Sequence, residues 1–212
     1  MSTSGRPMRP TLSRDYILHT ALHIVDRDGS DKLTMRRLGT ELGVDPMAIY
    51  HYVPNKAALF DGIAETIWSS LDLGVPSPDE TWQQQLIAAM RALRGVLRAH
   101  PNAVALVGTR PVTSPELLTV IEQLLGFLTE AGMPADADTA DLLSTLVNYT
   151  IGQVLAEVGE PVGAESAPAN YQALSPQTHP HLSALLNNGW TYDPDAQYDH
   201  GLNALLAGWR QT

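Results

Sequence analysis

Apolar residues recur every three or four positions along most of this chain, and this spacing limits its fold more than any other feature. Ile17, Ala21 and Ile24, for example, fall on one face of a helix. No stretch alternates strongly between apolar and polar residues, as a half-buried strand would, and no unit of 20–50 residues repeats. We therefore predict an all-α fold.

Capping residues predict where the first helices begin and end. Ser13, Thr34, Asp45 and Asn55 each precede an apolar helical pattern, and their side chains suit the N-cap position. Gly43 suits the left-handed position that ends the second helix. The helices that follow these four caps are expected to end near residues 28, 42, 52 and 71. Further helices are expected near 79–99, 101–107, 114–131, 136–158 and 195–210.

Breaks in these patterns suggest how the chain is organised. Residues 1–12 carry no periodicity and predict a flexible arm, and a proline-rich linker begins at Gly74. We therefore expect a helical head over 13–73 and a larger helical body over 74–212. The stretch from 159 to about 180 holds six prolines and glycines, so it predicts a long loop.

The charge of the chain is unevenly distributed. The net charge is -10, yet residues 1–60 carry eight basic and six acidic side chains, against five basic and seventeen acidic in 61–212. Such asymmetry indicates different partners for the two parts. Cysteine is absent, which excludes a disulfide scaffold, a thiolate zinc site and a cysteine nucleophile. No run of 18 apolar residues and no secretory signal is present, so we expect a cytoplasmic protein without a membrane partner.

Two short helices joined by the turn Leu42-Gly43-Val44 predict a helix-turn-helix, whose second helix would enter a DNA major groove. That helix carries no lysine or arginine, so its neighbours must contribute to binding. Bases are expected to contact Arg36 and His51, and phosphates Lys56. The full set of expected DNA contacts is Thr34, Arg36, Arg37, Pro46, Met47, Ala48, Tyr50, His51, Tyr52 and Lys56. Three short helices with a glycine turn also occur in bundles that bind no nucleic acid, and spacing alone does not separate the two.

The order of motifs around this turn resembles the DNA-binding head of the TetR family of transcriptional repressors. The matching segments are Leu33-Thr34, Leu42-Gly43-Val44, Ile49-Tyr50 and Asn55-Lys56-Ala57-Ala58-Leu59. Later segments resemble the ligand-binding domain of the tetracycline repressors: Val107-Gly108-Thr109-Arg110-Pro111, residues 127–132, and Tyr198-Asp199-His200-Gly201-Leu202. The resemblance implies a homodimeric repressor that binds a palindromic operator duplex and is released by a small organic effector.

The chain differs from the tetracycline repressors at the residue that binds the magnesium ion of the drug. The resemblance places a magnesium-binding histidine of those repressors at the position of Leu106. Two further drug contacts, a histidine and an asparagine, correspond to about Asp72 and Ala89. Leucine cannot ligate a hard cation. We therefore expect an effector that binds without a metal or cofactor.

A mostly apolar effector is expected in a cavity that the fourth to eighth helices line, with the long loop covering its entrance. Aromatic and aliphatic side chains would form its walls, and Arg94 and Asn148 its polar anchors. The candidates are Trp68, Trp82, Leu86, Met90, Arg94, Leu106, Leu124, Phe127 and Asn148. For each of them the alternative is an ordinary core position. Arg91, Arg94 and Arg98 share a helix face, which is typical of a solvated or ion-paired surface.

Two other function classes stay open. No catalytic motif is present, so we do not expect an enzyme. The chain would nevertheless be a small-molecule-binding or enzymatic helical protein if its head no longer bound DNA. It would be an interaction protein if the body had no cavity.

Apolar residues on more than one face of 136–158 and 195–210 predict that these two helices form a homodimer interface.

Overall fold

The computed structural model describes residues 11–110, 115–159 and 175–209, and within them every regular element is helical. The all-α prediction is confirmed. The α-helices are α1 Arg14–Asp28, α2 Met35–Leu42, α3 Pro46–Tyr50, α4 Lys56–Ser69, α5 Trp82–Ala99, α6 Val104–Gly108, α7 Pro115–Glu130, α8 Ala137–Val158, α9 Pro180–Asn187 and α10 Pro194–Gly208. Short 3-10 turns cover Ser30–Lys32 and Pro101–Ala103. None of the described helices combines the length and hydropathy needed to cross a bilayer.

Side-chain caps fix the starts of the head helices as predicted. The Thr34 hydroxyl accepts a hydrogen bond of 3.1 Å from the backbone N–H of Arg37 at the start of α2. The same arrangement caps α1, α3 and α4 at Ser13, Asp45 and Asn55. Gly43 ends α2 with a φ of 68°, a conformation that favours glycine because it has no Cβ.

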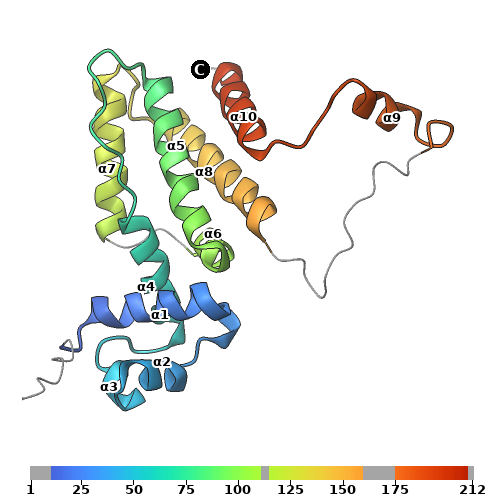
Figure 1. Ribbon diagram of the computed structural model, residues 1–212. Helices are drawn as coiled ribbons and strands as arrows, with labels where there is room; N and C mark the ends of the chain where they lie inside the picture. Colours follow the sequence, from blue (N-terminus) through green and yellow to red (C-terminus); the bar gives the residue numbers. More distant parts are fainter. Residues whose placement is uncertain (1–10, 111–114, 160–174, 210–212) are drawn as a thin grey trace, which may run out of the picture.

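The head, α1 to α4, packs around a filled apolar core in which α1 lies across α2 and α4 (Figure 1). Leu38, Ile49 and Leu59 have no exposed surface. Gly39 lies where α2 meets α3, and a Cβ there would come within 2.9 Å of the Val44 carbonyl oxygen. This close approach determines the angle between the two helices of the helix-turn-helix.

The body is built on α5 and α8, which pack against each other, with α7 and α10 beside them (Figure 1). Tyr198 of α10 is fully buried, and its hydroxyl donates a hydrogen bond of 2.9 Å to the Met90 carbonyl of α5. Arg91 pairs with Asp199 at 2.9 Å. The helix face that carries Arg91 is thus ion-paired, which confirms that prediction.

Two helices of the head contact the lower end of the body. In the last turn of α1, Asp26 lies 2.9 Å from Nδ1 of His100, and its carbonyl accepts a hydrogen bond of 2.9 Å from the Asn102 side chain. On α4, Asp61 pairs with Arg110 at 2.7 Å. These two polar contacts lie at separate places, and α4 also packs against α6 and α7 of the body.

Helix α9 was not predicted from the sequence. It lies away from the rest of the body in Figure 1, and Leu182 and Leu185 are 40% and 44% exposed. The expected loop over 159–180 falls largely on residues 160–174, outside the described residues, as does most of the expected arm over 1–12.

Candidate DNA-binding surface and effector cavity

Helix α3 is the centre of the candidate DNA-binding surface. Ile49 anchors it in the head core, while Met47 is 67% exposed and Tyr50, His51 and Tyr52 are also exposed. A short helix held by one buried residue presents most of its remaining side chains outward. Helix α2, which begins after Thr34, packs against α3, and α4 begins with Lys56 a few residues after α3 ends.

The basic residues of this region differ in what they contact. Arg36 is exposed, whereas Arg37 donates a hydrogen bond of 2.6 Å to Asp28. Hydrogen bonds from Arg27 lower the pKa of Asp28 and of Glu41 below their ordinary values. Arg37 therefore belongs to an ion-pair cluster inside the head, and Arg36 is the arginine of α2 with the freer side chain.

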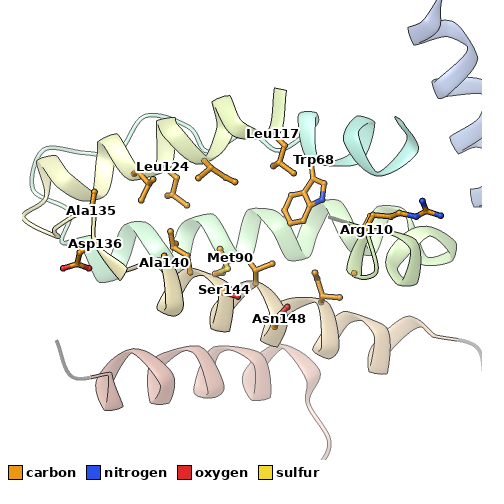
Figure 2. Close-up of a pocket in the computed structure, with 17 residues that line it drawn as sticks. Trp68, Met90, Arg110, Leu117, Leu124, Ala135, Asp136, Ala140, Ser144 and Asn148 are labelled. Atoms are coloured by element: carbon orange, nitrogen blue, oxygen red, sulfur yellow. The ribbon is translucent and has the colours of Figure 1, made fainter. Parts of the chain in front are cut away.

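The body contains a cavity of about 520 Å³ between α4, α5, α6, α7 and α8. Figure 2 shows apolar side chains along its length, with Trp68 and Arg110 toward one end and Asp136 at the other. Ser144 and Asn148 of α8 add polar groups along one wall. A volume of this size accommodates a drug-sized molecule.

Four of the predicted effector residues line this cavity: Trp68, Met90, Leu124 and Asn148. The other five lie elsewhere. Leu86 and Leu106 are buried in the core, and Trp82 packs against it half-buried. Phe127 borders a separate surface hollow of about 320 Å³ beside the loop after α4. The fifth is Arg94.

Arg94 is held in an ion-pair cluster and does not reach the cavity. Its guanidinium pairs with Glu157 at 2.8 Å and Asp195 at 2.7 Å, and stacks 4.6 Å from the ring centre of Tyr198. Burial opposes the charged form, yet the two carboxylates outweigh it and raise the pKa of Arg94. The guanidinium joins α5, α8 and α10, so the expected polar anchor is a structural link instead.

Three polar cavity residues were not identified from the sequence: Arg110, Asp136 and Ser144. Asp136 begins α8, where its side chain accepts a hydrogen bond of 3.0 Å from the Thr139 N–H. Arg110 belongs to a motif that was recognised for its family resemblance and not as part of a site. Arg110 follows α6 and lies four residues after the candidate residue Leu106, and this nearness in sequence could have identified it as a cavity residue.

A helix-turn-helix head joined to a helical body with an internal cavity defines a class of protein, the ligand-responsive DNA-binding regulator. Residues 17–63 match the family described as "Bacterial regulatory proteins, tetR family", and residues 75–212 match "Tetracyclin repressor-like, C-terminal domain". The chain belongs to the TetR family.

Individual relatives cover nearly the whole chain. An HTH-type transcriptional regulator of Saccharopolyspora erythraea is 32% identical over 96% of this chain and 87% of its own length. The class A tetracycline repressor from transposon 1721 of Escherichia coli is 34% identical over 93% of this chain and 90% of its own. Among solved structures, ActR of Streptomyces coelicolor in complex with actinorhodin superimposes with a TM-score of 0.79 at 25% identity, covering 94% of this chain and 97% of ActR. The protein is a ligand-responsive transcriptional regulator of the repressor type.

Proposed function

We propose that residues 13–73 form the operator-binding unit and 74–212 the effector-binding and dimerisation unit. In the first, Arg36 and His51 read base edges, Met47 makes apolar contact, and Lys56 holds a phosphate. Of the remaining contacts expected from the sequence, Ala48, Pro46, Thr34, Tyr50 and Tyr52 would border the same surface, whereas Arg37 is held by Asp28. The observation that carries this proposal is that α3 presents exposed side chains around a single buried residue. Because a bacterial regulator of this family meets its operator DNA inside the cell, we propose that the protein acts in the cytoplasm.

The test begins with selection of a bound duplex from a random pool by the wild-type chain. Arg36→Ala should then cost about 1–3 kcal/mol of binding free energy and relax one base position. Lys56→Ala should weaken all sequences alike and flatten the salt dependence by about one unit. Arg91→Ala, a matched loss of an exposed arginine in the body, should change neither. Unaltered base preference in the Arg36 variant would contradict the assignment.

For the effector, we propose an extended, mostly apolar organic molecule that binds the 520 Å³ cavity without a metal. The position of the tetracycline repressors' magnesium ligand is Leu106, and it is buried in apolar surroundings. The relatives' names and titles include tetracycline and actinorhodin, which supports an organic compound of several rings as the body of the molecule.

Release of the selected operator measures this proposal. Polycyclic aromatic compounds should release the protein from the operator even when a chelator removes all metal ions. Asn148→Leu should change the concentration of compound that gives half-maximal release. Release by tetracycline at micromolar concentration that is lost when magnesium is chelated would overturn the metal-free assignment. Arg91→Ala again provides the control, because its side chain lies outside the cavity lining.

We further propose that the functional unit is a homodimer formed by α8, α9 and α10. Small side chains, such as Ala204 and Ala207, are exposed on α10, which permits close helix packing. The leucines of α9 are exposed to solvent in the described part of this chain, and a second copy of the chain would bury them. Part of the second apolar face of α8, from which dimerisation was inferred, lines the cavity with Leu143 and Val147, whereas Leu155 of the same helix is 44% exposed and would join the interface.

Sedimentation tests the dimer. Ala204→Glu combined with Ala207→Glu should produce monomers that bind the operator poorly, while Gln123→Glu on α7 should leave the dimer intact. Leu206 is unsuitable for this test because it is buried within its own chain. A wild-type chain that sediments as a monomer at micromolar concentration would contradict the proposal.

A further inference from the structure

Arg110 belongs to the effector cavity and to the attachment of the head at the same time. Its side chain lines the end of the cavity that lies toward the head, and in Figure 2 the guanidinium points out of the cavity from there. The guanidinium donates hydrogen bonds to the Asp61 carboxylate at 2.7 Å and to the Ala57 carbonyl at 3.5 Å, both on α4. One side chain thus connects the space for the effector with the helix that begins at the DNA surface.

The same guanidinium stacks on the first turns of α4. Arg110 lies 5.5 Å from the ring centre of Phe60, and Lys56 lies 5.1 Å from the same ring. Phe60 is therefore contacted by two cations, one beside the cavity and one expected at the DNA backbone. A movement of Arg110 would therefore alter the contacts of the ring on which Lys56 also lies.

The pair with Asp61 is a weak one. The Asp61 side chain is 57% exposed, so water screens its charge and competes for its oxygens. A charged partner inside the cavity would meet less competition, because an ionic contact strengthens where water is excluded. Arg110 can therefore exchange its partner on α4 for a better one in the cavity.

The remaining cavity wall defines what that partner is. Among the described residues that line the cavity, Arg110 is the one basic side chain and Asp136 the one acidic side chain. Asp136 already accepts the Thr139 N–H at the start of α8, at the opposite end of the cavity in Figure 2. An anionic group buried among apolar walls needs a cation or several donors beside it, and in this described lining Arg110 supplies that cation.

We propose that Arg110 is the residue that selects and reports the effector: the effector carries an acidic group, such as a carboxylate, sulfonate or ionised phenol, that takes the guanidinium from Asp61 and so loosens α4. This inference rests on the proposed effector cavity and adds the chemical class of its ligand. The apolar body of the molecule fills the cavity, and the acidic group determines whether the head is released.

Two matched dyes test this inference on the full-length chain. The probe is 1-anilinonaphthalene-8-sulfonate, and N-phenyl-1-naphthylamine is the same ring system without the sulfonate. Fluorescence titration should show that Arg110→Gln weakens binding of the sulfonate dye roughly tenfold or more, the usual effect of losing a charged hydrogen bond. The neutral dye should change by less than about twofold. Arg91→Gln should affect neither dye.

Asp61→Asn provides the second variant and keeps Arg110 in place. Removing the competing carboxylate should strengthen binding of the sulfonate dye roughly two- to fivefold, the range expected for an exposed ion pair. Operator affinity is then measured with the cavity occupied to the same extent by either dye. The sulfonate dye should lower the operator affinity of the wild-type chain at least as much as the Asp61→Asn substitution does without dye. The neutral dye should lower it less.

The outcomes distinguish the two proposals. If neither dye binds the wild-type chain saturably, the effector cavity itself is wrong and the inference falls with it. If both dyes bind and Arg110→Gln changes them equally, or Asp61→Asn leaves the sulfonate dye unaffected, the cavity stands and the role of Arg110 is wrong.

Discussion

The head and the body of this protein are stabilised in different ways. In the head, apolar side chains such as Leu38 and Leu59 fill the core, and charged groups stay near the surface. In the body, a cavity of about 520 Å³ takes the place of such filling, and buried polar links such as Arg94 and Tyr198 hold the helices around it. A surface that reads DNA must keep one shape, whereas a ligand site needs space that the protein itself leaves empty.

The largest expected effect comes from matched leucine truncations. Leu59→Ala in the head core should lower the free energy of unfolding by about 2–5 kcal/mol, because it removes packed atoms and leaves a void. Leu124→Ala should cost less than half as much, because Leu124 already borders open space. Urea unfolding at a fixed protein concentration measures both. Equal costs would mean that the body is packed as tightly as the head.

A pair of glycines should show effects of opposite sign. Gly39→Ala forces a Cβ against the Val44 carbonyl, so it should destabilise the head by about 1–3 kcal/mol and reduce operator affinity. A Cβ on Gly95 of α5 would meet no atom within 4 Å, so Gly95→Ala should stabilise the body by about 0.5–1 kcal/mol. Thermal unfolding and operator titration measure both. A Gly39 variant with wild-type affinity would contradict the close approach of α2 and α3.

Tyr198→Phe tests the polar links of the body. Loss of the buried hydroxyl should cost about 1–2 kcal/mol at neutral pH and leave head-specific operator contacts unchanged. Burial raises the pKa of Tyr198 to about 12. The unfolded phenol ionises near pH 10, so the wild-type chain should lose stability as the pH rises from there through 12, and the variant should lose less. Identical alkaline profiles would show that Tyr198 is not the group responsible.

The smallest effect is expected at acid pH in the head. Arg27 lowers the pKa of Asp28 and of Glu41, so the ionised carboxylates stabilise the folded state. That contribution is complete above the unfolded pKa values of about 4 and is lost as the pH falls through the lower folded values. Urea midpoints between pH 5 and 3 should therefore fall more steeply for wild type than for Arg27→Gln. Parallel curves would contradict the assignment.

The sequence predicted the head more completely than the body because the head depends on local chemistry. Thr34, Asp45 and Gly43 fix helix ends through backbone groups a few residues away, and such contacts can be recognised from spacing. The close approach at Gly39 was missed, since it depends on how two helices cross. Helix α9 was missed because it is a short apolar run that follows a long stretch of sequence without periodicity.

The cavity was only partly predictable for a related reason. Helical spacing shows which side chains turn inward, but it does not show whether they meet a neighbour or a space. Met90 and Leu86 lie on the same helix and both are buried, yet only Met90 reaches the cavity. Arg94 was expected there as a polar anchor. Its partners on α8 and α10 are far away in the sequence, so the ion pairs that hold it could not be identified from spacing.

The two contacts between head and body restrict the motion of the head. A unit held through one helix can turn in any direction, whereas a unit held at two separate places turns easily only about the line that joins them. Here that line runs from Asp26, which holds His100, to Asp61, which holds Arg110. Without the contact to Arg110, the Asp26–His100 contact and the packing of α4 against α6 and α7 would remain. We therefore expect the head to take a wider range of orientations, including ones that match no operator.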